Sequence, residues 1–268
     1  MKRIAFIAVN YNNSGFTLEY ANSILSIDRN GWQADILIVD NASDTDDFTS
    51  LEKNLSLVDG VTLIRSTSNL GYFGGLNLGL EKLEKENYNY ILIGNNDLTF
   101  EKTFLSELNH IHLTSDILVL APDVVTVNGF HQNPLCAERM SMFRKWGLRL
   151  YYTNYYYGRF TYHVVQFLKK QIKPNRKLME SRTIYMGIGA AYILTPEFFK
   201  HFPKLWDDVF LWSEEALLAG QIDSVKGKML YCPGLIIHHA ENTSVKKIPS
   251  RKTYEMARIS FLKTFRYY

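Results

Sequence analysis

Asp97 is the residue of this 268-residue chain whose surroundings most clearly suggest chemistry. It follows a short apolar run, residues 90–93, and the amides of Asn95 and Asn96. In an open α/β sheet, ligands bind at the carboxyl ends of the strands. A single carboxylate at such an end is suited to hold a metal ion or a hydroxyl group. Position alone therefore makes Asp97 a candidate binding residue.

Two other expected strand ends also carry polar side chains. Residues 3–9 run into Asn10, Tyr11 and Asn12, and residues 36–39 run into Asp40 and Asn41. An aspartate at a strand end can accept a hydrogen bond from a pyrimidine base or a ribose hydroxyl. An ordinary helix-capping role is equally compatible with Asp40. Three neighbouring polar strand ends favour a nucleotide pocket.

The segment 69–79 is rich in glycine but matches neither the GxGxxG fingerprint nor a P-loop. Glycines allow a backbone to approach a ligand closely, and a helix that follows them favours phosphate at its N-terminus. Tight packing of that helix on a sheet explains the glycines equally well. The missing fingerprint counts against a nicotinamide-dependent enzyme.

Two pairs of titratable residues occur late in the chain. Glu214 and Glu215 follow an aromatic run, and partial burial would raise the pKa of one carboxyl towards that of a general base. Spacing alone favours the alternative in which Ser213 caps a helix and both acids are solvated. His238 and His239 end the last expected strand, where side chains alternate between faces. A histidine there is either a packed residue or a metal or phosphate ligand.

The elements that must position these residues alternate between strand and helix over the first 120 residues. This repeat predicts an α/β fold with a mostly parallel, doubly wound sheet. The expected strands cover residues 3–9, 36–39, 61–65, 90–93, 117–120 and 229–237. The expected helices cover 16–27, 46–57, a segment that follows the glycine-rich turn and ends near 86, and segments starting near 101, 196 and 213. Residues 129–181 show no clean period and are expected to form an insertion. Residues 250–268 are expected to form a basic amphipathic helix at the end of a single domain.

Composition excludes several classes of protein. The net charge of +3 gives no indication of a nucleic-acid partner, and the two cysteines, Cys136 and Cys232, are too far apart for a zinc motif or a disulfide framework. A reducing cytosol is the expected compartment. No segment approaches the ~18 uncharged apolar residues of a membrane-spanning helix, and the apolar N-terminal run is too short for a signal peptide.

Taken in order, the motifs resemble those of family 2 glycosyltransferases. The likeness is greatest to the rhamnosyltransferase-like members that build bacterial capsule and O-antigen polysaccharides. The resemblance implies a GT-A fold in which residues 1–128 bind the nucleotide sugar and residues 182–249 contribute the acceptor and catalytic half. It also implies inverting transfer from a UDP- or dTDP-linked donor to a glycan or a lipid-linked acceptor.

The resemblance implies a role for each candidate residue. Glu215 would be the general base, with Glu214 beside it, and Asp97 with His239 or His238 would bind Mg²⁺ or Mn²⁺. The residues implied to contact the donor are Asn10, Tyr11, Asn12, Asp40, Asn41, Asn69, Gly71, Gly74, Gly75, Asn77, Asn95 and Asn96. Two positions depart from the family pattern: Asn95 stands where a second metal-binding carboxylate is usual, which predicts weak metal binding, and Leu217 replaces a third acid.

Basic and aromatic residues in segments 139–177 and 251–268 fit a protein that is cytoplasmic and peripheral on the inner face of the cell membrane. An ordinary insertion with a solvated basic face fits them nearly as well. Two other functions also remain open. A sugar-nucleotide nucleotidyltransferase would carry basic residues directly after the first strand, and residues 10–15 contain none. A catalytically silent homologue would bind a glycan or serve as a scaffold.

Overall fold

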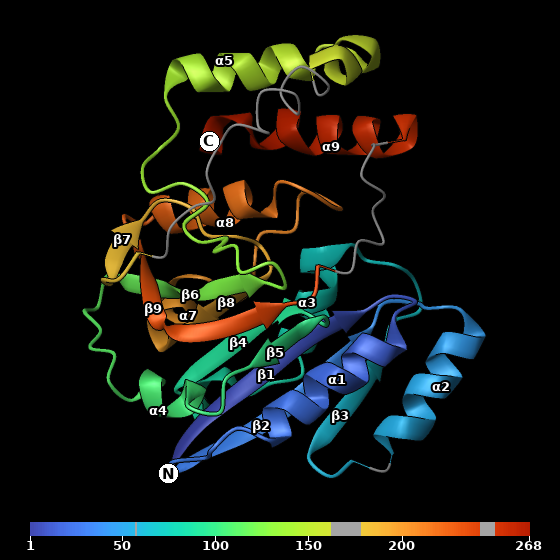
Figure 1. The fold of residues 1–268 in the computed structure, drawn as a ribbon, viewed down its shortest axis with the longest axis vertical. Coiled ribbons are helices and arrows are strands. Elements are labelled where there is room, and N and C mark those ends of the chain that lie inside the picture. The colour runs from blue at the N-terminus through green and yellow to red at the C-terminus, as the bar shows by residue number, and fades with distance from the viewer. Residues whose placement is uncertain (57, 162–177, 242–249) are drawn as a thin grey trace.

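The computed structural model describes residues 1–56, 58–161, 178–241 and 250–268. Within these residues nine strands form one curled, mixed sheet with helices on both faces (Figure 1). The strands are β1 Lys2–Asn10, β2 Trp32–Asp40, β3 Val61–Arg65, β4 Tyr90–Asn95, β5 Leu98–Phe100, β6 Ile117–Thr126, β7 Arg182–Ile184, β8 Ala191–Leu194 and β9 Lys228–His239. The helices are α1 Ser14–Leu25, α2 Thr45–Leu55, α3 Tyr72–Leu80, α4 Phe104–Leu108, α5 Met142–Tyr151, α7 Pro196–His201, α8 Glu214–Asp223 and α9 Arg251–Thr264, with short 3₁₀ turns η1 Lys85–Asn87 and η2 Phe265–Tyr267.

The sheet has a parallel half and a mixed half. Strands β3, β2, β1 and β4 pair in parallel, as the repeated β-α units predict. β8 then lies antiparallel between β4 and β6, and β9 pairs with β6 in parallel and with β5 and β7 antiparallel. The register places Asn10 opposite Asp40 and Val9 opposite Asn95. Three of the predicted polar strand ends therefore lie side by side at one edge.

Alternation along the strands creates two cores. In β1, Ile4 and Phe6 pack on the face covered by α1, α2 and α4, whereas Ala5 and Ile7 pack on the face covered by α3, α7 and α8. This period of two, with apolar residues on both faces, is what a sheet buried on both sides requires. The sheet is therefore a rigid base for the residues at its edge.

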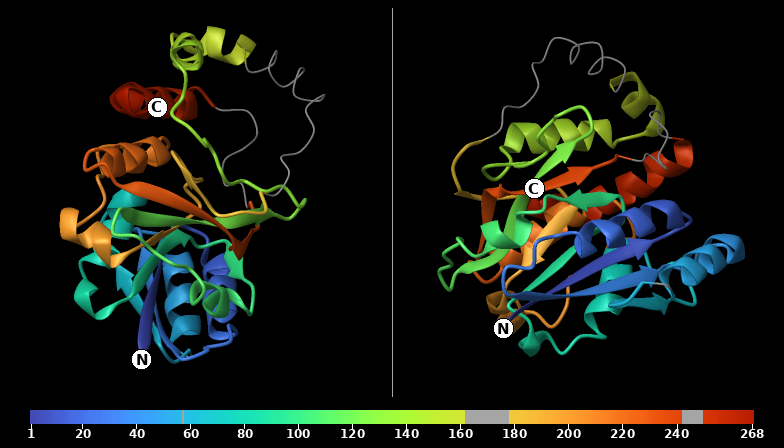
Figure 2. Two further views of the ribbon diagram at one scale, coloured as in Figure 1. Left: turned by 90° about the vertical axis from the view of Figure 1, so that its left-hand side faces the viewer. Right: turned by 60° about the horizontal axis from the view of Figure 1, so that its bottom comes forward.

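Helices α9 and α5 form a further layer beyond α8 (Figure 2). The ring of Tyr152, which follows α5, stacks on Phe261 of α9 at 4.7 Å. α9 in turn contacts the segment before α8, where the Ser260 hydroxyl donates to the Leu211 carbonyl at 2.7 Å. The expected helix in residues 250–268 is thus present, and it connects α5 to α8.

Several elements differ from the sequence-based prediction. β6 extends beyond residue 120 to Thr126 because it follows β9 through an irregularity at Pro122. The helix expected to reach residue 86 ends at Leu80, and the one expected near 101 begins at Phe104. Helix α5 lies inside the expected insertion. Residues 162–177 of that insertion and residues 242–249 lie outside the described part of the chain. No described helix is both long enough and apolar enough to cross a bilayer.

Candidate active site

Asn10 is the centre of a buried polar network at the ends of β1 and β2. Its side-chain amide donates to Asp40 Oδ1 at 2.9 Å, to Asp47 Oδ2 at 2.9 Å and to Ser43 Oγ at 3.1 Å. Its Oδ1 accepts a hydrogen bond from the Thr17 hydroxyl at 2.9 Å. Asn10 therefore fixes two strand ends to α1 and α2, and its side chain is fully buried.

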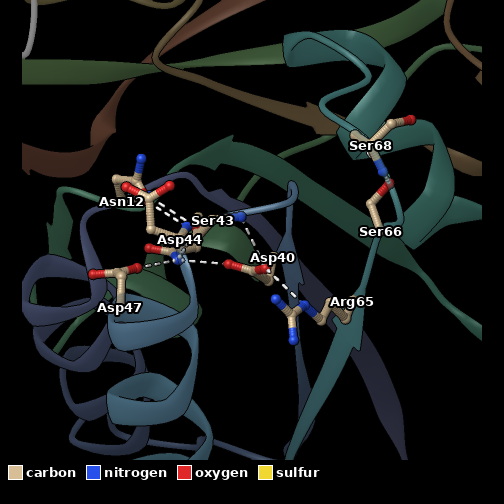
Figure 3. A network of polar contacts seen from close by, with 9 residues as sticks. Asn12, Asp40, Ser43, Asp44, Asp47, Arg65, Ser66 and Ser68 are labelled. Atoms are coloured by element: carbon tan, nitrogen blue, oxygen red, sulfur yellow. Dashed lines mark hydrogen bonds and ion pairs between the residues drawn. The ribbon is translucent and has the colours of Figure 1, made fainter.

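Asp40 is held by the same network. Its Oδ2 accepts the Ser43 backbone N–H at 3.2 Å and lies 3.9 Å from Arg65 Nε. Figure 3 shows the carboxylate directed towards these groups, and it has no exposed surface. Direct contact between Asp40 and a base therefore stays a prediction. In the observed arrangement, Asp40 orders the loop that follows β2.

Tyr11 and Asn12 lie on the solvent side of this network. The Asn12 backbone adopts a left-handed φ of 54°, and its N–H donates to Ser43 Oγ at 2.9 Å. Its Oδ1 accepts the Asp44 N–H at 2.7 Å. Tyr11 is 51% exposed, so its ring face is accessible for stacking.

Asn41 fixes the glycine-rich loop. Its Nδ2 donates to Asn69 Oδ1 at 3.1 Å and to the Gly71 carbonyl at 3.0 Å, and its Oδ1 accepts the Leu70 N–H at 2.9 Å. Gly71 has φ +77°, and a Cβ there would lie 2.2 Å from the Phe210 carbonyl oxygen. The loop thus needs glycine at 71 because it passes directly against the segment that leads into α8.

The remaining predicted residues of this loop make packing contacts. A Cβ on Gly75 would lie 3.0 Å from Val9, and one on Gly74 would lie 3.0 Å from Leu70 Cβ. The buried Asn77 amide donates to the Leu205 carbonyl at 2.9 Å, and its oxygen accepts the Leu205 N–H at 2.9 Å. Asn77 therefore lies against the Leu205 loop and is not brought to the strand ends.

Asp97 and His239 meet at the edge formed by β5 and β9. Register pairs Leu98 with His239, which places Asp97 Oδ1 3.3 Å from His239 Nε2. His238 faces the other way, and its Nε2 lies 2.7 Å from Glu101 Oε1. Of the two predicted histidines, only His239 therefore joins Asp97. Asn95 also reaches His239, with 3.4 Å between Nδ2 and Nε2.

Asn96 points away from this edge. Its Nδ2 donates to the Thr17 hydroxyl at 2.7 Å and to the Asn13 carbonyl at 3.3 Å. The three residues 95–97 thus face different partners. Asn96 joins the network around Asn10, while Asp97 and Asn95 face His239.

Gln132 determines which nitrogen of His239 carries a proton. The Gln132 amide nitrogen donates to Glu241 Oε1 at 3.0 Å, so its Oε1 is directed at His239 Nδ1, 2.8 Å away. Because a carbonyl oxygen only accepts, Nδ1 must donate, and the lone pair of Nε2 then faces the Asp97 carboxylate. A divalent metal ion could therefore be bound by this nitrogen and this carboxylate together. Sequence patterns gave no signal for Gln132.

The residues at this edge fit Mg²⁺ or Mn²⁺. Carboxylate oxygen suits both ions, and imidazole nitrogen favours Mn²⁺. In the described ranges no three or more His, Cys, Asp or Glu side chains form a metal cluster, so a metal here would take its other ligands from water or phosphate. A cavity of about 300 Å³ adjoins the pair and is also lined by Phe16, Glu19 and Val127.

Glu214 and Glu215 begin α8, Glu214 in a buried position and Glu215 in a partly buried one. Glu214 is 5% exposed, and its Oε1 has no hydrogen-bond partner in the described part of the chain. Burial, together with the adjacent Glu215 charge, raises the pKa of Glu214 to about 8. Burial also raises the pKa of Glu215, whose Oε1 accepts the Gly189 N–H at 3.3 Å. The alternative of two solvated acids is therefore wrong, and Ser213 makes no side-chain cap.

Gly189 and Ala190 connect the acid pair to the end of β4. The Tyr72 hydroxyl donates to the Gly189 carbonyl at 2.9 Å, and the Asn95 N–H donates to the Ala190 carbonyl at 2.9 Å. The same two residues thus contact Glu215 on one side and the Asn95–Asp97 segment on the other. The Gly189–Ala190 segment therefore links Glu215 to the end of β4 that precedes Asp97.

The backbone before Glu214 is strained and supported from α9. Trp212 and Ser213 both adopt left-handed φ angles, 66° and 67°. Such angles cost about 1–2 kcal/mol each for residues other than glycine, and they persist where neighbouring contacts hold them. The Tyr268 hydroxyl donates to Ser213 Oγ at 2.9 Å, and Lys263 donates to the Asp208 carbonyl at 2.8 Å. The end of the chain therefore helps to position the acids.

Known proteins share this fold at low sequence identity. GalNAc-T7 with UDP, GalNAc and Mn²⁺ superposes with a TM-score of 0.64 at 13% identity, over 98% of this chain and 48% of that one. The mannosyltransferase PcManGT from Pyrobaculum calidifontis with GDP-Man and Mn²⁺ gives 0.57 at 13% identity, over 99% and 68% of the two chains. TarS 1–349 from S. aureus with UDP-GlcNAc gives 0.59 at 16% identity, over 98% and 66%. These similarities show the GT-A fold.

Sequence comparison points the same way. The chain is 29% identical over 116 residues to the low-salt glycan biosynthesis hexosyltransferase Agl10 of Haloferax volcanii. That match covers 43% of this chain and only 36% of the relative. The family model described as Glycosyl transferase family 2 matches residues 6–184, more than half of the chain, and the protein therefore belongs to this family.

Proposed function

We propose that the protein is an inverting glycosyltransferase that moves a sugar from a UDP- or dTDP-linked donor to a hydroxyl of a glycan or a lipid-linked acceptor. The observation that carries the proposal is that Gly189 contacts Glu215 while the adjacent Ala190 contacts Asn95, two residues before the Asp97 that faces His239. The acid pair can accept a proton, and the Asp97–His239 pair can bind a metal ion whose positive charge lies near the leaving diphosphate. Cell-surface polysaccharide synthesis is the proposed setting.

Glu215 is the proposed general base. Its Oε1 is oriented by the Gly189 N–H, and burial raises the pKa of this carboxyl, which strengthens it as a proton acceptor. It would take the proton of the acceptor hydroxyl as that oxygen bonds to the anomeric carbon and the bond to the diphosphate breaks. A single displacement of this kind inverts the anomeric configuration. Glu214, with a pKa of about 8, is largely protonated at neutral pH and leaves the negative charge to its neighbour.

The donor would bind along the strand ends. The exposed ring of Tyr11 offers a stacking surface for the base. Asp40 orders the loop that follows β2, and Asn41 fixes the glycine-rich loop. Asp97 and His239 would hold Mg²⁺ or Mn²⁺, which supplies positive charge to the departing nucleoside diphosphate. The similar structures contain Mn²⁺ together with UDP or GDP-Man, which supports a divalent metal and a nucleotide as the bound molecules.

A thermal-shift panel of UDP, dTDP, GDP and CMP, each with and without Mn²⁺, tests donor binding. We expect UDP or dTDP with Mn²⁺ to raise the Tm by about 5–10 °C at a hundredfold excess over Kd. GDP and CMP should have smaller effects. If none of the four nucleotides changes the Tm under either condition, both the transferase and the nucleotidyltransferase functions are excluded.

Glu215→Gln tests the chemistry separately from binding. Transfer should fall by about 10²- to 10⁴-fold, because the amide cannot accept the proton, while the nucleotide-dependent Tm shift is retained. The matched Glu214→Gln variant should keep most of its activity. Full loss in Glu214→Gln with activity retained in Glu215→Gln would assign the base to Glu214. Wild-type protein that binds nucleotide but transfers no sugar would instead be a silent homologue.

A further inference from the structure

Helix α5 has its apolar side chains on the outside. Phe143 is 91% exposed, Trp146 50% and Leu150 55%, whereas Lys145 is only 8% exposed. At 3.6 residues per turn these three apolar residues and Met142 lie on one side of the helix. A helix on the surface of a globular protein normally shows the opposite arrangement. The outward stripe of α5, residues 142, 143, 146 and 150, therefore needs a partner.

The fold itself occupies the other side of α5. The Tyr254 hydroxyl donates to the Tyr151 carbonyl at 2.7 Å, and Arg258 Nε donates to the Tyr152 carbonyl at 2.8 Å. These contacts fix the C-terminal end of α5 against α9 (Figure 1). The outward stripe is thus a consequence of packing, and farther along the chain the rings of Tyr156 and Phe160 are exposed as well.

The charges around the stripe have one sign. Residues 139–161 contain five basic residues and no acid; of the five, Lys145 is buried and Arg139 lies 3.4 Å from Asp223. At 3.6 residues per turn the exposed Arg149 lies beside the stripe and Arg144 on the opposite side of α5, and the Arg149 guanidinium lies 5.0 Å from the centre of the Trp146 ring. Apolar and aromatic side chains bordered by cations are the composition of helices that lie in the interface of anionic membranes.

We propose that the outward stripe of α5 docks the protein on an anionic lipid surface, with Phe143 and Trp146 inserted among the headgroups and Arg149 and Arg159 on phosphates. A second copy of the chain fits this face less well, since two-fold contact would bring the same basic residues together. The inference rests on the proposed function in one respect: it assigns the lipid-linked acceptor to the side of α5. α9 connects this face to the segment before the acid pair.

Vesicle co-sedimentation of the full chain tests the docking face. Phosphatidylcholine vesicles with one third phosphatidylglycerol should pellet the wild type, and pure phosphatidylcholine should pellet little. The variant Phe143→Ser with Trp146→Ser should partition about tenfold less. Arg149→Gln with Arg159→Gln should lose about fivefold per cation removed. Leu25→Ser, at an exposed leucine of α1, is the matched control and should behave as the wild type.

Brominated lipid gives a second, position-specific readout. Bound wild type should show quenching of its tryptophan fluorescence, and Trp146→Phe should lose most of that quenching while it still pellets. Equal pelleting by all variants, or absence of pelleting by the wild type, would overturn the proposal. Self-association abolished by the Phe143→Ser, Trp146→Ser variant, without vesicle binding, would assign the face to a second copy. The nucleotide-dependent Tm shift, measured in parallel, reports separately on the proposed transferase site.

Discussion

His239 and Asp97 are 142 positions apart in the sequence and adjacent in the site because β5 and β9 pair antiparallel. Because side chains alternate along β9, the neighbouring residues His238 and His239 face opposite sides of the strand. His239 faces Asp97 and Gln132, and His238 faces Glu101. This geometry provides a matched pair of substitutions.

His239→Ala should weaken Mn²⁺-dependent nucleotide binding by more than about tenfold, because it removes the nitrogen directed at Asp97. His238→Ala should leave binding unchanged, and Asp97→Ala should abolish the Mn²⁺ dependence. Titration of UDP in the presence and absence of Mn²⁺ measures all three. An equal effect of the two histidine variants would show that neither acts as a specific ligand.

Glu214 should make stability depend on pH. Its pKa is about 8 in the folded protein and near its ordinary value in the unfolded chain. The unfolded chain therefore loses this proton at lower pH, and the free energy of unfolding falls as pH rises from about 4.5 to 8. Because each tenfold change in ionisation is worth about 1.4 kcal/mol, the fall should amount to several kcal/mol.

Urea unfolding of wild type and Glu214→Gln at pH 5, 7 and 9 measures this effect. The variant should lose much of the pH dependence and should gain on the wild type at pH 9. Some dependence should remain, since burial raises the pKa of Glu215 as well. Identical slopes in the two proteins would show that Glu214 ionises normally.

Sequence reasoning selected candidate residues but did not identify most of their partners. Asp97, His239 and the acid pair were identified because carboxylates and imidazoles at element ends have few structural reasons to be there. The roles of Asn10 and Asn77 were harder to predict, because the sequence does not show whether a side-chain amide contacts a ligand or the protein itself. Gln132 gave no signal, because its function depends entirely on its two partners, Glu241 and His239.

In the glycine-rich loop, residues 69–79, the backbone geometry leaves little space for a side chain. Gly71→Ala should lower the free energy of unfolding by about 2 kcal/mol or more, because it combines a left-handed φ with a Cβ against the Phe210 carbonyl. Gly15→Ala in α1, where a Cβ meets nothing within 4 Å, should leave stability unchanged or slightly raised. Urea denaturation compares the two. Equal midpoints would show that the loop can move away from Phe210.

Strands and helices could be predicted where the spacing of apolar residues along the sequence reflects their burial. The strands β1 to β4 and their helices follow from apolar runs and turns, and β3 agrees in both bounds. β5 has only three residues, which is too few for a pattern. α5 was not predicted because its ten residues lie within a long stretch, residues 129–181, in which basic and aromatic residues hide the helical period.

At the scale of the whole molecule, the acid pair depends on a layer that is distant in sequence. Residues of α9 and the end of the chain contact Leu211, Ser213 and Asp208, which precede the acids. The same layer carries α5 on its outer side. A single stack of helices therefore links the proposed membrane face to the proposed catalytic base.

A fragment of residues 1–128 should not behave as an independent domain. It retains β3, β2, β1 and β4 but lacks β8, so the edge of β4 would be left unpaired and open to other chains. We expect light scattering to show aggregation of the fragment at concentrations where the full chain is monodisperse. A soluble, cooperatively unfolding fragment would establish the first half as a domain of its own.

The central position of β8 also has a consequence for synthesis. β4 is complete at Asn95, but the strand that covers its edge begins at Ala191. At about 5–20 residues per second, a nascent chain waits roughly 5–20 s before that edge can be closed. During this interval the growing polypeptide presents a template for aggregation on the ribosome. The order of the strands in the sheet therefore predicts that folding in the cell depends on chaperones.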